Sequence, residues 1–315
     1  MNQWTFTKGL HELGEDIYAY IQPDGSWCLS NAGLIVDGRQ SMLVDTLTDL
    51  AHTRELLDAI YKKIGASIKS VVITHGNIDH WLGNELVKDA EIIATEKCAE
   101  EMKAMPPEMM VHLIKGAPQL GEAGEYFTQF FGKFNFEGIT PTYPTRTFHG
   151  QLDLKLGNTE IRLIDVGPAH TTSDLIVYVP EKRVVFAGDI LFINGTPLMW
   201  EGPVSNWIKA CDLMLALDAE IFVPGHGPIT DKKGVEELKG YWHYLEEEAK
   251  KRFEAGMSVF DAARDIPLGK YKAWGESERI CVNVNTLYNE FRKEPVETNS
   301  LELFRYMANY AKKWK

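Results

Sequence analysis

The stretch Val71-Val72-Ile73-Thr74-His75-Gly76-Asn77-Ile78-Asp79-His80 decides our interpretation of this 315-residue chain. Residues 71–73 are apolar and β-branched, which is typical of a strand that is buried on both faces. The polar residues follow at once, so we expect them on the loop at the C-terminal end of that strand, where α/β sheets place their ligands. Imidazole and carboxylate groups at this spacing indicate a metal site, because they are natural ligands of zinc, iron and manganese.

Three later segments each place one ligand-type residue directly after a short apolar run. The residues are His170, Asp189 and His226, which follow the apolar runs 161–164, 184–187 and 221–223. Each run predicts a strand, so each polar side chain again lies at a strand end. We therefore expect side chains from distant parts of the chain to converge. A capping loop with surface histidines is the alternative interpretation of the first motif.

The order and spacing of these residues resemble the metallo-β-lactamase superfamily. Its first motif is His-x-His-x-Asp-His, followed by a distant His, a bridging Asp and a last His, and the match runs through residues 15–230. The resemblance implies an α/β fold, a four-layer αβ/βα sandwich, with a catalytic domain over residues 1–230. Residues from about 96 to 145 are then a helical insertion, and residues 231–315 are a helical C-terminal extension.

The resemblance also implies two metal positions and one departure from the family pattern. One metal would use His75, Asn77 and His170, the other Asp79, His80 and His226, with Asp189 bridging them. Asn77 stands where the family has its second histidine. A neutral amide oxygen donates less strongly than imidazole and suits harder cations, so the first position is weakened. Alternatively, Asn77 only hydrogen-bonds a neighbouring ligand.

Three metal contents fit this set of residues. We favour two ions, with Asn77 as a weak ligand and zinc as the metal; iron and manganese are alternatives. A single ion at the intact second position is another interpretation. The third is a single ion held by His75, His170 and Asp189, which is the arrangement of non-haem iron oxygenases.

These expectations favour a metal-dependent hydrolase. A metal-bound hydroxide would attack an ester, thioester, lactone or amide bond of a small substrate. Asp79 is the predicted catalytic residue, because it would hold its metal and orient the nucleophile. The alternatives are the mononuclear iron oxygenase that uses His75, His170 and Asp189, a metal-dependent lyase or cyclase, and a non-catalytic binding protein that lost its chemistry with the second histidine.

The insertion and the extension are candidates for substrate contact. Residues 96–145 are rich in methionine and phenylalanine, which form adaptable apolar pockets. We expect the insertion to cover the active site and to contact an apolar or aromatic substrate; packed core or a dimer face explains it equally well. In the extension, the candidates for a substrate-contacting residue are Tyr241, Trp242, His243, Trp274 and Arg279.

Four further residues receive predicted roles from their positions. Asp45 lies at the end of the predicted strand 42–46 and is expected to orient the metal loop. Asp174 is expected to be a cap or a hydrogen-bond acceptor, and His149 to lie on the surface. Trp81 either forms a wall of the site or packs in the core.

Composition limits the partners of the chain. A net charge of −12 argues against a polyanionic substrate, because nucleic-acid-binding proteins usually carry a basic face. We therefore expect a small-molecule substrate and no nucleic acid, and leave homo-oligomer formation open. The four cysteines form no close pair and are expected to be reduced, mostly buried thiols. The N-terminal residues lack the pattern of a signal peptide or a membrane span, so we expect a cytoplasmic protein without membrane contact.

The remaining elements follow from hydrophobic periodicity and turn residues. The pattern predicts a hairpin of strands 15–22 and 27–36, a helix over 50–64, a helix from Trp81 to Val87, a strand over 91–95, a second sheet formed by short strands between 147 and 189, a helix over 203–217, a strand over 220–223, and helices over 232–255, 259–265, 276–292 and 301–313.

Overall fold

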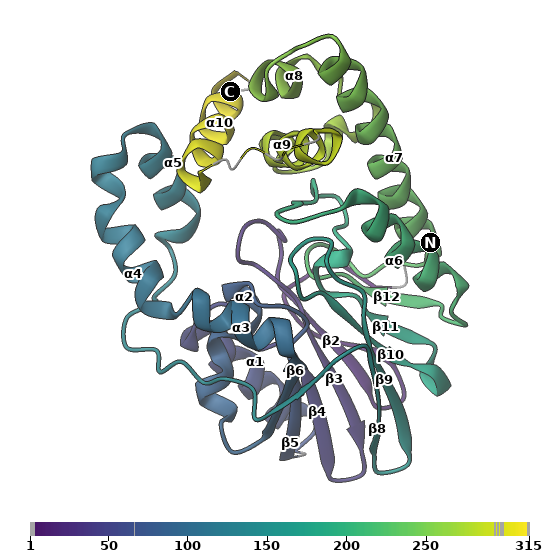
Figure 1. The fold of residues 1–315 in the computed structure, drawn as a ribbon. Helices are drawn as coiled ribbons and strands as arrows, with labels where there is room; N and C mark the ends of the chain where they lie inside the picture. Colours follow the sequence, from purple (N-terminus) through teal and green to yellow (C-terminus); the bar gives the residue numbers. More distant parts are fainter. Residues whose placement is uncertain (1–3, 66, 293, 295, 297–298, 314–315) are drawn as a thin grey trace.

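The computed structural model describes residues 4–65, 67–292, 294, 296 and 299–313. In this part of the chain, two β-sheets face each other and helices cover their outer faces (Figure 1). The predicted four-layer αβ/βα arrangement is therefore confirmed.

The first sheet follows the order of the chain. Its strands among the described residues are β1 (Gly9–Gly14), β2 (Ile17–Ile21), β3 (Ala32–Asp37), β4 (Gln40–Val44), β5 (Ser67–Val72), β6 (Glu91–Thr95) and β7 (Arg146–Phe148). The pairs from β1 to β4 are antiparallel and those from β4 to β7 are parallel. Parallel pairs need a crossover connection, which α1 (Leu50–Lys63) supplies between β4 and β5. The Asp49 carboxylate caps this helix by accepting a hydrogen bond from the His52 N–H.

The second sheet has the strand order β12-β11-β10-β9-β8 in the described chain. The strands are β8 (Gln151–Leu156), β9 (Thr159–Asp165), β10 (Leu175–Val179), β11 (Val184–Phe186) and β12 (Ile221–Val223). The sequence analysis predicted that the second sheet begins near residue 147, which is one strand too early. Thr147 lies in β7, which pairs with β6 in the first sheet, because the Thr145 N–H already bonds to the Ile92 carbonyl and continues that sheet.

Alternate residues along the strands face two different cores. Ile17 and Ile35 face the layer between the sheets, where they join residues of the second sheet such as Val177. Their neighbours Tyr18 and Leu34 belong to the core beneath the helices. This period of two is why the strands read as continuous apolar runs: both faces are buried.

The hairpin of β2 and β3 is confirmed, but its second strand begins at Ala32 rather than Trp27. Residues 22–31 form a loop that reaches the strand ends of the second sheet. The Asn31 side chain donates hydrogen bonds to the carbonyls of Pro224 and Gly227. The Ser30 hydroxyl donates to the Asp79 carbonyl. These long-range bonds outweigh the β propensity of the segment.

Short helices connect the strands on both sides of the sandwich. They are α2 (Ile78–Trp81), η1 (Leu82–Val87), η3 (Pro180–Lys182), η4 (Gly188–Ile190) and α6 (Val204–Ala216). The insertion forms α3 (Glu96–Ala104), α4 (Pro107–Gly116), η2 (Ala117–Leu120) and α5 (Glu122–Phe131). Its helical character was predicted, and the residues between α5 and β7 are irregular.

The extension is helical, as predicted, and returns to the insertion. Its elements are α7 (Lys232–Glu254), α8 (Val259–Asp265), η5 (Gly269–Ala273), η6 (Ser277–Arg279), α9 (Ile280–Phe291) and α10 (Ser300–Lys313). Figure 1 shows α10 beside α5, above the end of the sandwich. The ring of Phe304 on α10 lies 5.5 Å from the ring of Phe127 on α5. None of the described helices is both long and apolar enough to span a membrane.

Candidate metal centre

Asp45 holds the loop that follows β5, as the sequence predicted. Its carboxylate accepts hydrogen bonds from the N–H and the hydroxyl of Thr74, both at 2.8 Å. The same carboxylate lies 2.8 Å from Nδ1 of His80. A carboxylate can only accept, so Nδ1 carries a proton, and Nε2 of His80 is directed away from Asp45 and is the nitrogen left for a metal.

Two other histidines are fixed in the same way by backbone carbonyls. Nδ1 of His170 lies 2.5 Å from the Leu198 carbonyl, and Nδ1 of His226 lies 3.1 Å from the Gly25 carbonyl. A carbonyl also only accepts, so Nδ1 of both rings carries a proton and Nε2 is the nitrogen left for a metal. A metal requires this tautomer, with one ring nitrogen bonded to the protein and the other free.

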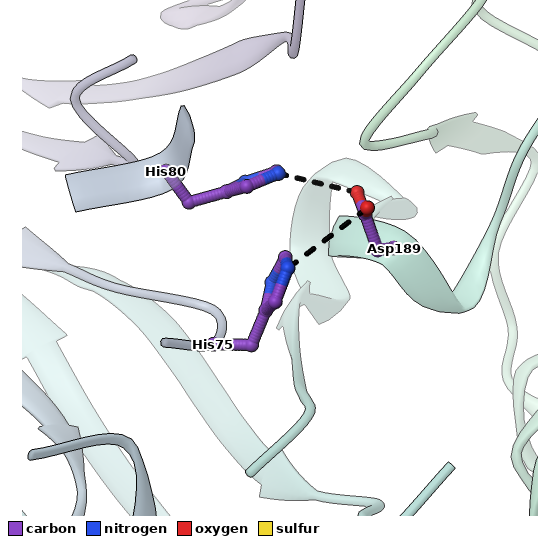
Figure 2. A group of neighbouring side chains, drawn as sticks. All are labelled: His75, His80 and Asp189. Atoms are coloured by element: carbon purple, nitrogen blue, oxygen red, sulfur yellow. Dashed lines mark ion pairs between the residues drawn. The ribbon is translucent and has the colours of Figure 1, made fainter. Parts of the chain in front are cut away.

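Asp189 is the point at which these histidines meet. Its carboxylate oxygens lie 3.2 Å from Nε2 of His80, 3.3 Å from Nε2 of His170, 3.4 Å from Nε2 of His226 and 3.9 Å from Nε2 of His75. Figure 2 shows the rings of His75 and His80 directed at this carboxylate. Side chains from loops of both sheets are thus brought together, as the sequence predicted.

The donor atoms fit a bound cation. Nε2 of His75, Nε2 of His80 and Oδ1 of Asp189 are buried and make no hydrogen bond in the described chain. Buried polar atoms normally have hydrogen-bond partners, so buried donor atoms that face one another without hydrogen bonds suit a bound cation. A Cβ on Gly225 would lie 1.9 Å from Oδ1 of Asp189, so the chain leaves room there for that carboxylate.

The described residues contain two compact groups of candidate ligands. One is His75, His80 and Asp189; the other is Asp79, His80 and His226. In each group the ligand atoms lie within 4.8 Å of one another. His80 belongs to both, so the two groups form one cluster. His75, His170 and Asp189 do not form such a group, although His170 is close to Asp189.

Asn77 contacts a candidate ligand. Its Nδ2 lies 2.8 Å from Nε2 of His170. Since Nδ1 of His170 bonds to the Leu198 carbonyl, Nε2 accepts this bond from the amide. The alternative in which Asn77 hydrogen-bonds a neighbouring candidate ligand is therefore the geometry observed.

The acidic groups of the cluster are ionised in spite of burial. Burial opposes the charged form of Asp189, but His226 and His80 outweigh it and hold the pKa of this carboxyl well below its usual range. Burial also opposes ionisation of Asp79, and His80 and His226 again lower its pKa. Oδ2 of Asp79 lies 3.2 Å from Nε2 of His226. Two negative charges in a buried site favour a cation.

The four histidines of the cluster form two pairs, one with lowered pKa values and one with raised pKa values. Burial and the neighbouring His80 hold the pKa of His75 well below its usual value, and burial also lowers the pKa of His170. For His80, burial is outweighed by Asp189 and Asp79, and the pKa is well above its usual value. The same balance raises the pKa of His226 to about 9. The protein without metal therefore holds protons where a cation would bind.

A family model, the Metallo-beta-lactamase superfamily, matches residues 25–226. The chain belongs to the metallo-β-lactamase superfamily. It carries the buried His and Asp cluster of a metallo-hydrolase. A relative in Nocardioides sp. (strain JS1661), the 2,4-dinitroanisole O-demethylase subunit alpha, is 22% identical over 284 residues, which cover 87% of this chain and 70% of the relative. The hydroxyacylglutathione hydrolase of Brucella ovis is 25% identical over 193 residues, which cover 60% of this chain and 59% of the relative.

A solved structure supports the fold over most of the length. The stereoselective inverting sec-alkylsulfatase from Pseudomonas sp. superposes with a TM-score of 0.66 at 17% identity and covers 90% of this chain. The chain spans 50% of the length of that alkylsulfatase. The family model ends at residue 226, but the structural similarity to the alkylsulfatase covers 90% of this chain. The similarity therefore includes part of the helical extension.

The His and Asp cluster borders a cavity of about 720 Å³. Its polar lining includes Asn77, Asp79, His170, Asp189 and His226. We call the apolar part of the lining that comes from the insertion and the extension the apolar wall; it is formed by Met105, Met110, Leu113, Phe127, Phe131 and Phe304. The insertion therefore lines the site, as the sequence predicted, and α10 completes the wall.

The smaller sequence-based predictions are resolved by burial and hydrogen bonding. Trp81 is fully buried in the core and does not line the described cavity. His149 is exposed. The Asp174 carboxylate accepts hydrogen bonds from the N–H groups of Ala169 and Thr171, so its predicted role as an acceptor is confirmed. The four cysteines are free and buried.

Two contributors to the cavity had no clear signal in the sequence. Glu101 of α3 accepts hydrogen bonds from the N–H groups of Gly76 and Thr172, and so ties the loop of the first motif to the loop of His170. A charged residue on an amphipathic helix gives no sign of this contact. Trp27 and Cys28, on the loop after β2, also line the cavity. Of the five extension candidates, all within the described chain, only Arg279 lines it.

Proposed function

We propose that this chain is a metal-dependent hydrolase that cleaves an ester, thioester, lactone or amide bond in a small apolar or aromatic substrate. The observation that carries the proposal is the cluster around Asp189, whose buried donor atoms face one another without hydrogen bonds beside a cavity with a largely apolar lining. A bound divalent cation makes hydroxide available at neutral pH and polarises the scissile carbonyl.

Different residues would hold the metal, orient its ligands and act on the nucleophile. His80, His226 and Asp79 would hold one ion, and Asp189, which lies near His75 and His170 as well, would contribute to both positions. The carbonyls of Leu198 and Gly25 and the Asp45 carboxylate hold the rings, so the donor atoms need little reorganisation. Asp79 lines the cavity and is the proposed catalytic residue, because its carboxylate would accept a hydrogen bond from the nucleophile and orient it.

We propose two zinc ions that differ in how tightly they are held. The position of Asp79, His80 and His226 contains only imidazole and carboxylate donors, which suit zinc. The other position has lost an imidazole at Asn77, whose amide bonds to Nε2 of His170. An ion there must displace that hydrogen bond, so we expect it to bind more weakly.

The hydrolase proposal accounts for more of the site than the iron oxygenase. An oxygenase that used His75, His170 and Asp189 would leave Asp79, His80 and His226 without a role, although they form a compact buried group. The names of the relatives also support hydrolysis: they include a hydroxyacylglutathione hydrolase and an alkylsulfatase. The 2,4-dinitroanisole O-demethylase subunit acts on an aromatic compound, which agrees with the apolar wall.

Metal analysis combined with a substrate screen tests the proposal. The purified chain is analysed by inductively coupled plasma mass spectrometry and assayed on a panel of aryl and alkyl esters, thioesters, lactones and amides. We expect zinc at between one and two ions per chain, and turnover that a chelator abolishes and zinc restores. Iron together with oxygen consumption would instead support the oxygenase, and no metal with no turnover would support a binding protein.

A further inference from the structure

Arg279 is a buried cation in the wall of the cavity. It lies at the end of η6, directly before α9, and its side chain is only 2% exposed. The residue lines the same cavity as the His and Asp cluster. Arg is rarely buried to this extent unless its charge is compensated.

The guanidinium has few partners. Its Nη1 donates a hydrogen bond to the Thr196 carbonyl at 3.1 Å, while Nε is buried without a partner. Within the described chain no carboxylate forms an ion pair with it. Glu278 accepts a hydrogen bond from the Tyr126 hydroxyl instead. Burial raises the pKa of the Glu276 carboxyl, and the nearby Arg279 opposes this rise.

Aromatic rings hold the guanidinium near the cluster. It lies 4.4 Å from the ring centroid of Trp27 and 5.6 Å from that of Phe192. The Phe192 ring in turn stacks on His226, with 5.2 Å between centroids and 4° between planes. The Phe192 ring therefore lies between the Arg279 guanidinium and His226, a candidate metal ligand.

Much of the remaining lining of the cavity is apolar, although the carboxylates of Asp79, Glu101, Asp189 and Glu201 also belong to it. The apolar wall consists of methionine, leucine and phenylalanine side chains. A cavity of about 720 Å³ is large enough for a drug-sized molecule. A ligand that fits this lining combines an apolar body with a group that pairs with a guanidinium, and oxyanions fit its planar set of donors best.

We propose that Arg279 binds the oxyanion group of an amphiphilic organic anion, a carboxylate, sulfonate, sulfate or phosphate attached to an alkyl or aryl body that lies against the apolar wall. This inference rests on the proposed function for the class of reaction, and it names the class of substrate. The position of Arg279 in the cavity lining, the lack of an ion-paired carboxylate in the described chain and the single ring between Arg279 and His226 favour an oxyanion that lies between Arg279 and the cluster.

Isothermal titration calorimetry with unreactive probes tests the assignment. Decane-1-sulfonate, decan-1-ol and decyltrimethylammonium share one alkyl chain and differ in charge, and none contains a bond for the enzyme to hydrolyse. The protein as purified should bind the sulfonate at least about tenfold more tightly than the alcohol, because hydrogen bonds to charged groups are the strong ones. It should bind the cation most weakly.

Variants separate Arg279 from the metal. Arg279→Met should lose the preference for the sulfonate and keep its affinity for the alcohol, with metal content unchanged by mass spectrometry. Arg279→Lys keeps the charge without the planar donors and should retain part of the preference. Arg264→Met removes an exposed arginine from the same extension and should behave as the unaltered protein.

Each outcome bears on the proposal. Equal affinity of the unaltered protein for sulfonate and alcohol would overturn it, whether or not Arg279→Met folds. If folded Arg279→Met still prefers the sulfonate, the bound metal ions rather than Arg279 bind the anion. This result would also overturn the proposal. Binding of the probes does not require turnover, so a failed substrate screen would leave this result standing.

Discussion

Asp189 is the residue on which the cluster depends most. It lies within 4 Å of Nε2 on the four histidines His75, His80, His170 and His226. We expect Asp189→Ala to lose most of its bound metal, and at least about 100-fold in activity, because residues that merely orient metal ligands already cost 10- to 100-fold. Metal content and the hydrolysis rate measure this.

Asp153→Ala is the matched control for that change. Asp153 is an exposed carboxylate on β8, and its loss should leave metal content and rate unaltered. Full metal content and normal turnover in Asp189→Ala would refute the assignment of Asp189 as the bridging ligand.

We expect Asn77 to limit zinc affinity at the proposed second metal position. The imidazole of Asn77→His would replace an amide that now bonds to His170, and imidazole is the stronger donor for zinc. We expect this variant to bind the second zinc ion at least about tenfold more tightly, with the fold retained. Titration of the metal-free protein with zinc in competition with a chromophoric chelator measures both affinities.

Asn77→Ala provides the comparison. This variant frees Nε2 of His170 without adding a metal-binding donor. Its affinity for the second zinc ion should therefore stay below that of Asn77→His. If Asn77→His and Asn77→Ala bind zinc equally, then position 77 does not contribute a ligand.

Metal affinity should depend on pH through His226. Burial lowers the pKa of this imidazole, but Asp189 and Asp79 outweigh it and raise the value to about 9 in the metal-free protein. Below that pH, a cation must displace a proton, so affinity should rise with pH from 6 to about 9, by about tenfold per unit for each proton released. Chelator competition at several pH values measures the slope. A zinc affinity that stays constant over this interval would contradict it.

The contact between α5 and α10 closes the cavity. Phe304 on α10 lies near Phe127, Phe131 and Trp27, and all four line the cavity. We expect Phe304→Ala to weaken the binding of decan-1-ol by about tenfold, because removing a large apolar contact costs about 1.5–3 kcal/mol. Calorimetry measures the dissociation constant.

Arg305→Ala serves as the control on the same helix. Arg305 is exposed and should not affect the binding of the alcohol. Unchanged affinity in Phe304→Ala would show that α10 is not part of the ligand site and that only the insertion forms the wall.

The two halves of the molecule meet at the metal centre. His75, Asp79 and His80 follow strands of the first sheet, while His170, Asp189 and His226 follow strands of the second. A bound cation therefore links the two sheets. The stabilisation from a ligand present at 100 times its dissociation constant is about 2.7 kcal/mol. We expect a chelator to lower the melting temperature of the protein by about 5 °C or more.

Protonation of His80 and His226 limits the stability that the protein loses when the metal is removed. In the metal-free protein His80 and His226 take up protons and pair with Asp79 and Asp189, so the chain should remain folded at 25 °C. Differential scanning calorimetry with and without chelator measures the shift, and Asp189→Ala should show little further shift. An unaltered melting temperature after verified metal removal would mean that the cations do not join the sheets.

The sequence alone determined which residues come from strand ends. Apolar runs that stop at a polar residue mark a buried strand and the start of a loop, and both are local properties of the chain. The helix over 50–64, the strand over 91–95 and the helical extension were predicted for the same reason. The His and Asp cluster was also predicted, because its spacing resembles a known motif and the carboxyl ends of such strands share one edge of the fold.

Only the tertiary structure decided what surrounds the cluster. Residues 27–31 were predicted as part of a strand, but they belong to a loop that Asn31 holds to the loop after β12, some 190 residues later. Glu101 and Arg279 are ordinary charged residues in the sequence, and they gain their roles from contacts with the loop of Gly76 and with the ring of Trp27. Burial of a charge, and the absence of a partner for it, depend on the whole fold. Local patterns do not encode them, because the contacts that create them join segments far apart in the chain.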